Sequence, residues 1–250
     1  MKHILFIATL AGAVLTSPHL IQAQTNTADA ATVAVDREKA SVEKQARQLS
    51  EAIQLTDAGK SAKVHDILFA HYQTLRAWHA ANDAQIREDW TSFNKARSAK
   101  NVADANAALD KISAIYAGFQ PEHKKFLADL GTLLTPEQIE AIKDKWTINK
   151  VKVTYNAYLE IFPNLTEAQK AVVLQNLKDA REEALDCDRK SLGNKSFDEI
   201  SAFFKKYKIK IEDEYFVAQG IDAQKARKDF AEKQKADKAA KSGGAEKADK

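Results

Sequence analysis

Residues 57–98 read DAGKSAKVHDILFAHYQTLRAWHAANDAQIREDWTSFNKARS. Large apolar side chains recur here every three or four positions, which is the spacing of one face of an α-helix. They are Val64, Ile67, Leu68, Tyr72, Leu75, Trp78, Ile86, Trp90 and Phe93. The pattern predicts a long helix over 57–98 that Thr56 caps and that turns one face toward a core.

The composition of the whole chain agrees with long helices. Its 250 residues include only 8 Gly and 4 Pro, against roughly 18 and 12 at average usage. Turns, hairpins and phosphate-binding loops depend on these two residues, so the scarcity argues against many-stranded β, collagen-like and dinucleotide-binding chains. We expect an all-α, single-domain helical bundle of about six to seven helices.

Helix-start signals divide the rest of the chain. Thr135 with Gln138, Thr166 with Gln169 and Ser196 with Glu199 each have the spacing of a capping box. Further helices are expected over about 36–58, 101–118 and 121–130. The stretch TINKVKVT at 147–154 is rich in β-branched residues, which lowers its helix propensity, so it predicts an irregular or extended break.

The N-terminus has the layout of a secretory signal. Lys2 precedes the apolar run Ile4–Leu15, Pro18 breaks that run, and Ala23 offers a small residue at a cleavage point. The run is too short to span a bilayer. We therefore predict a signal peptide over 1–23, cut after Ala23, and a periplasmic or secreted mature protein with no transmembrane segment.

Both flanks of the expected helical domain, 36–224, are low in apolar residues. The segments 24–35 and 225–250 cannot bury enough surface to offset the entropy of ordering, so they are predicted to be a disordered linker and a disordered Lys/Ala-rich tail. The tail carries a charge of +4 and the domain a charge of −2, within a total of +3. The net positive charge of the chain therefore comes from the tail, and no nucleic-acid partner is expected.

A search for catalytic and metal-binding motifs finds none. The sequence lacks nucleophile-elbow, zinc-protease, phosphate-loop, dinucleotide and C-x-x-C patterns. His65, His71 and His79 lie on the long helix but not at the i, i+4 spacing of a helical metal pair. Cys187 is the single thiol. We expect no catalytic residues, no metal and no cofactor, and hence no enzyme.

Four polar residues share the apolar stripe of the long helix: His71, Asn82, Gln85 and Asp89. Buried polar groups need partners. The set is interpreted either as a polar site that lines the core or as a satisfied hydrogen-bond cluster.

The segment from Trp146 to Tyr158 is the candidate ligand site. Trp146, Thr154, Tyr155, Asn156 and Tyr158 combine aromatic rings with hydroxyl and amide groups around the expected break. Aromatic faces stack on sugar rings, and the polar groups fix orientation. The alternative is that these aromatic residues belong to the core.

Residues 132–186 resemble a known family. VTYNAYLE at 153–160 and PNLTE at 163–167 carry the similarity, together with the run at 55–83. They are similar to a family of secreted bacterial proteins, the domain of unknown function numbered 3826. The resemblance implies a sugar-binding role without defined catalytic residues. Asn149 and Lys152 stand where the family has Gly and Pro, and the link near 187–196 is longer here.

The repeated L-T-x-x-Q pattern at Leu134 and Leu165 also resembles periplasmic chaperones and stress sensors of the Spy type. The same residues are what any helix start favours. The function hypothesis is a carbohydrate-binding protein accessory to polysaccharide utilisation, and the alternative is an ATP-independent periplasmic chaperone. The sequence leaves the oligomeric state open.

Overall fold

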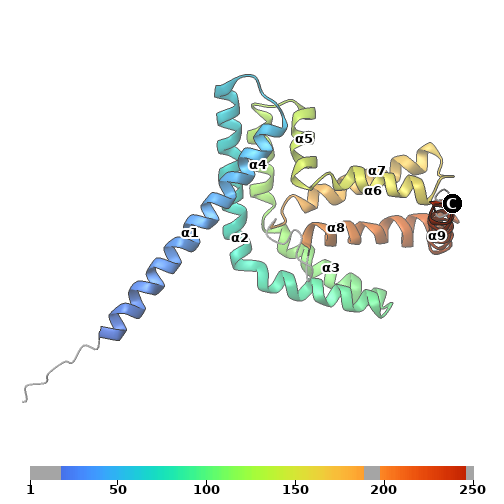
Figure 1. Ribbon diagram of the computed structural model, residues 1–250, viewed down its shortest axis with the longest axis horizontal. Coiled ribbons are helices and arrows are strands. Elements are labelled where there is room, and N and C mark those ends of the chain that lie inside the picture. Colours follow the sequence, from blue (N-terminus) through green and yellow to red (C-terminus); the bar gives the residue numbers. More distant parts are fainter. Residues whose placement is uncertain (1–17, 189–197, 246–250) are drawn as a thin grey trace, which may run out of the picture. The chain divides into compact units, whose positions relative to one another are not determined.

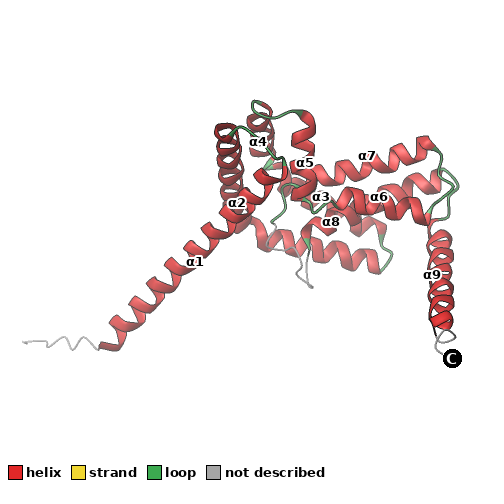
Figure 2. Cartoon of the chain, turned by 45° about the horizontal axis from the view of Figure 1, so that its top comes forward, coloured by secondary structure: helices red, strands yellow, loops and turns green. Residues whose placement is uncertain are grey.

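The computed structural model describes residues 18–188 and 198–245, and these ranges contain helices and turns but no strand (Figures 1 and 2). The chain divides into two units, residues 1–44 and 45–250, and each is described by itself. The helices are α1 (Pro18–Ala52), α2 (Ala58–Ser98), α3 (Val102–Ala117), α4 (Gln120–Gly131), α5 (Pro136–Trp146), α6 (Lys150–Ile161), α7 (Glu167–Ala184), α8 (Glu199–Lys208) and α9 (Ala223–Ala245), with a π-helical segment η2 (Ile209–Phe216) after α8. The all-α prediction is confirmed.

Helix α2 supplies the buried face that its periodicity predicts. The fully buried side chains on it include Val64, Leu68, Ile86, Trp90 and Phe93. It packs against both α3 and α4. The cap is one residue later than predicted, because the Asp57 side chain, and not that of Thr56, accepts a hydrogen bond from the third backbone amide of the helix.

A second group of helices forms around α7, which packs against α6 and α8 (Figure 2). The predicted capping boxes at Thr135–Gln138 and Thr166–Gln169 are both present, with each side chain bonded to the other residue's backbone amide. Ser196 lies outside the described residues. Helix α8 is capped by Asp198, which accepts from the amide of Ser201.

The predicted break at 147–154 is wrong in extent. Only residues 147–149 are non-helical, and α6 begins at Lys150. Ile148 and Asn149 take positive φ angles of 53° and 56°, which make the turn. The β-branched residues after the turn are nevertheless helical, because Val151 is buried and tertiary packing outweighs a weak intrinsic propensity.

Both flanks that are predicted to be disordered are helical where they are described: 24–35 lies in α1 and 225–245 in α9. In 225–245 the many Ala, Lys, Gln and Glu residues favour helix. Arg227 holds the first turns of α9, because its guanidinium donates to Glu212 and lies 5.8 Å from the ring centres of Tyr158 and Phe162.

Residues 1–17, which hold most of the predicted export signal, lie outside the described part of the chain. None of the helices within 18–188 and 198–245 is long and apolar enough to cross a membrane.

The cap at the start of α7 is testable. We predict that Thr166→Ala lowers the free energy of unfolding by about 1 kcal/mol, because the amide of Gln169 loses its side-chain acceptor. Thr91→Ala is the matched control, since Thr91 is exposed within α2 and Ala is the better helix former. Urea denaturation measures both variants, and equal stabilities would contradict the role of the cap.

Candidate functional site

Trp146 belongs to the core. Its side chain is fully buried, and its ring stacks on Tyr72 with centres 4.2 Å apart and planes 5° from parallel. The rings of His71 and Phe126 lie on other sides of it. This tryptophan therefore joins α5 to α2 and α4 and offers no face to a ligand.

Tyr158 is also buried. Its hydroxyl donates to Glu212 at 2.9 Å, and Arg227 holds the same carboxylate. Burial, followed by the charge of Glu212, raises the pKa of the tyrosine. The structure thus separates Trp146 and Tyr158 from the other residues of the predicted ligand site.

Tyr155 and Asn156 instead line a groove of about 630 Å³ between α5, α6 and α7. Asn156 is exposed and Tyr155 is half-buried. Thr154 is half-buried on the same helix but does not line the groove. The residues around the groove are Pro136, Glu137, Glu140, Ala141, Asp144, Val151, Lys152, Tyr155, Asn156, Leu174, Lys178 and Arg181.

Arg181 fixes the wall of this groove. Its guanidinium donates to Glu140 at 2.5 Å, to Asp144 at 2.6 Å and to Glu182 at 3.1 Å, while the side chain itself is almost completely buried. Burial acts to raise the pKa of Glu140, but the hydrogen bond and the charge of Arg181 outweigh it and lower that pKa. The carboxylate of Glu140 is therefore ionised, and Arg181 holds it and the side chain of Asp144 in place.

The four polar residues of the α2 stripe do not form one site. Gln85 donates to Asp89 at 3.2 Å, and Asn82 donates to the carbonyl of Trp78 within its own helix. His71 lies elsewhere, stacked on Phe126 with ring centres 3.8 Å apart. Burial, with a smaller repulsion from His123, lowers the pKa of His71 to about 3, so its ring is neutral.

A different polar network occupies the core, and sequence reasoning missed it. Nδ1 of His79 lies 2.9 Å from Asp83, and its Nε2 lies 2.8 Å from the backbone carbonyl of Asp186. The carboxylate of Asp83 and the carbonyl of Asp186 are both acceptors. The imidazole ring therefore donates both hydrogen bonds only when each of its nitrogens carries a proton. Nδ1 of His123 lies 2.7 Å from the Asp186 carboxylate, which also accepts from Gln120 at 3.2 Å.

Glu199 extends the network at the start of α8. It accepts from the hydroxyl of Tyr116 and, at 2.9 Å, from the backbone amide of Asp188. Burial raises the pKa of Glu199 to about 7, against the opposing influence of His79 and these two hydrogen bonds. Burial likewise raises the pKa of the neighbouring Cys187, which leaves the thiol protonated and unreactive.

The pair His79–Asp83 has the i, i+4 spacing of one helix face, but the bonds that join different helices link residues 63 to 107 positions apart, and no local pattern predicts them. Most of its members are buried, Asp83 and Gln120 are half-buried, and none of them lines the groove. No group of three His, Cys, Asp or Glu side chains within the described ranges is arranged to hold a metal ion. We interpret the network as a structural junction between α2–α4 and the α7–α8 region.

The raised pKa of Glu199 makes the stability of the junction depend on pH. Its folded pKa of about 7 exceeds the ordinary 4.5, so the folded state binds a proton that the unfolded state has lost. The stabilisation from that proton is present at low pH and is lost as the pH rises through 7. Between about pH 5 and pH 8 the free energy of unfolding of the wild type should fall by about 2 kcal/mol relative to that of Glu199→Gln, whose side chain cannot ionise.

Urea denaturation of both proteins at the two pH values measures this difference. The pH-dependent contributions of the other titrating groups cancel, because both proteins contain them. A stability difference between wild type and Glu199→Gln that stays constant with pH would show that Glu199 is already ionised in the folded protein at pH 5.

No curated protein matches the chain. Residues 39–236 match the family described as "Protein of unknown function (DUF3826)". The match covers all helices from α2 to α8 together with η2, and most of the chain. The chain therefore belongs to this family.

Proposed function

We propose that the protein is an exported, non-catalytic carbohydrate-binding protein, accessory to polysaccharide utilisation, and that it binds saccharides in the groove between α5, α6 and α7. The observation that carries the proposal is the placement of Tyr155. Its half-exposed ring lies in a groove that is also lined by charged and amide side chains and by a few apolar ones, such as Val151 and Leu174. Protein sites for sugars combine an aromatic face for the ring with polar groups for the hydroxyls.

The polar groups around Tyr155 suit hydroxyl recognition. Lys152 lies three residues before it and so shares its side of α6, and Asn156, the next residue, also lines the groove. Lys178 lines the groove from α7. The volume of about 630 Å³ falls within the ~300–1,000 Å³ of small-ligand sites.

The carboxylates of the groove support a binding role over a catalytic one. Glu140 and Asp144 both hold Arg181, and the pKa of Glu140 is lowered. A general acid needs a carboxyl group whose pKa is raised toward neutrality. Ionised carboxylates held by an arginine can instead accept hydrogen bonds from sugar hydroxyls in a preformed arrangement.

The chaperone alternative has less support. A holdase needs a contiguous exposed apolar surface. The exposed large apolar side chains of the described residues are spread along the chain, at Val33, Val35, Val102, Ile148, Val153 and Val217. In both L-T-x-x-Q segments the leucine is buried, and the threonine and glutamine form a capping box. Helix initiation and packing thus account for these segments.

Calorimetry with a panel of neutral and acidic polysaccharides tests the proposal. We predict binding by the wild type, and affinity about tenfold or more weaker for Tyr155→Ala, because the ring loses its stacking contact. Tyr155→Phe should retain most of the affinity. Val153→Ala is the matched control, since Val153 is exposed on the same helix and does not line the groove.

Flat titrations with every polysaccharide would overturn the carbohydrate proposal. Binding that Tyr155→Ala leaves unchanged would overturn the assignment of this groove.

A further inference from the structure

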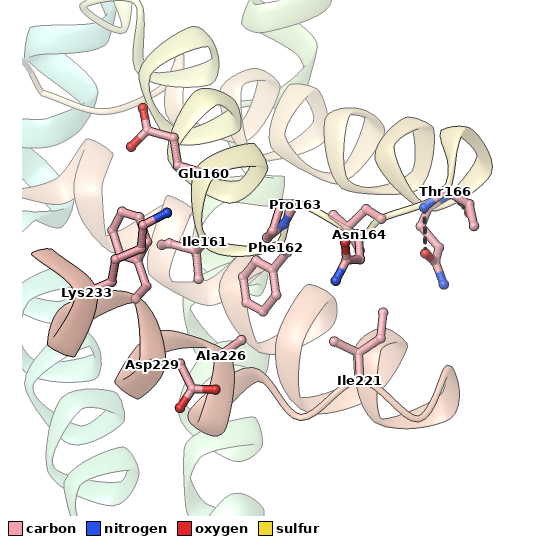
Figure 3. A pocket seen from close by; sticks show the side chains of 13 residues that line it. Glu160, Ile161, Phe162, Pro163, Asn164, Thr166, Ile221, Ala226, Asp229 and Lys233 are labelled. Atoms are coloured by element: carbon pink, nitrogen blue, oxygen red, sulfur yellow. Dashed lines mark hydrogen bonds between the residues drawn. The ribbon is translucent and has the colours of Figure 1, made fainter.

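A second hollow, of about 590 Å³, lies where the end of α6 and the following turn face α9 (Figure 3). Its volume also falls within the ~300–1,000 Å³ of small-ligand sites. None of the residues of the saccharide groove lines it. We call it the α9 cleft. Its lining residues are Glu160, Ile161, Phe162, Pro163, Asn164, Leu165, Thr166, Gln169, Ile221, Ala226, Asp229, Phe230 and Lys233.

The middle of the α9 cleft is apolar. Ile161 and Phe162 lie on one side of it in Figure 3, and Ile221 and Ala226 lie on the opposite side. Phe162 is fixed from behind, because its ring packs on those of Tyr158 and Phe216. The hollow therefore has a rigid apolar floor.

Helix α9 contributes the remaining aromatic side chain. Phe230 is the single large apolar residue in 225–250, and it is half-buried against the cleft. Ala226, Asp229 and Lys233 share its face of α9 at helical spacing, and all of them line the cleft. In a segment that is otherwise polar, the one aromatic residue lies where a ligand could cover it.

Polar groups lie at the two ends of the apolar strip. Glu160 and Lys233 lie at one end and Asn164 and Thr166 at the other (Figure 3). Asp229 is already paired, because its carboxylate lies 2.7 Å from Lys225.

The end with Glu160 and Lys233 therefore offers one carboxylate and one ammonium group, whose charges cancel. A purely anionic or cationic head group would be attracted by one of these two side chains and repelled by the other. A hydroxylated head can donate to the carboxylate and accept from the ammonium group.

We propose that the α9 cleft binds a small amphiphile, with its apolar chain between Phe162 and Phe230 and its hydroxylated, uncharged head beside Glu160 and Lys233. This site is separate from the saccharide groove and does not depend on the function proposed for it.

Calorimetry on the full chain with octyl glucoside, below its critical micelle concentration, tests the proposal. Octyl glucoside should bind, and free glucose should give no signal at this cleft. Octanoate and octyltrimethylammonium should bind about tenfold more weakly, because each meets one like charge. Absent binding of octyl glucoside, or equal affinities for the three octyl compounds, would overturn the proposal.

Substitutions locate the site. Phe230→Ala should weaken octyl glucoside binding about tenfold, because the chain loses one apolar wall. Lys228→Ala is the matched control, since Lys228 is exposed on α9 and does not line the cleft. Circular dichroism checks that both variants keep the helix content of the wild type.

Tyr155→Ala separates the two hollows. It should bind octyl glucoside as the wild type does, because Tyr155 lines the other groove. If Tyr155→Ala lost this binding and Phe230→Ala kept it, the amphiphile would occupy the saccharide groove and the α9 cleft would not be its site.

Discussion

The arrangement of helices from α2 onward depends on the hydrogen bonds of Asp186, just beyond the end of α7. Its backbone carbonyl faces His79 on α2, and its carboxylate faces His123 and Gln120 on α4. These hydrogen bonds lie beside one hydrophobic cluster that contains side chains of α2, α3 and α7. The residue is buried, and burial raises the pKa of its carboxyl group although the neighbouring histidines oppose that effect. Removing one partner of such a buried pair leaves an uncompensated polar group, which costs far more than an exposed ion pair contributes.

The junction also positions the groove between α5, α6 and α7. Arg181 lies on α7 five residues before Asp186, and it ties α7 to Glu140 and Asp144 on α5. Because α5 follows α4, His123 and Arg181 together fix the α5 and α7 walls relative to one another. Tyr155 and Asn156 enter between these walls from α6. Helix α6 serves both hollows, since Tyr155 and Asn156 line the groove while Glu160, Ile161 and Phe162 line the α9 cleft.

The helices could be predicted from local sequence because their causes are local. The stripe of α2 and the capping boxes at Thr135 and Thr166 depend on residues within a few positions of each other. The break at 147–154 was overestimated because Val151 gains burial that propensity does not include. Only Tyr155 and Asn156 of the predicted ligand residues line the groove, since periodicity does not show which neighbour covers Trp146 or Tyr158. Apart from the i, i+4 pair His79–Asp83, the histidine network joins residues far apart in sequence, so a spacing pattern does not predict it.

A double-mutant cycle between His123 and Asp186 tests the junction most directly. The free energies of unfolding of His123→Asn, Asp186→Asn and the double variant are measured by urea denaturation against the wild type. We predict a coupling energy of about 2 kcal/mol, as expected for a buried, charge-assisted hydrogen bond. If the two single-variant changes in unfolding free energy summed to that of the double variant within about 0.5 kcal/mol, the two side chains would act independently. That result would contradict the junction.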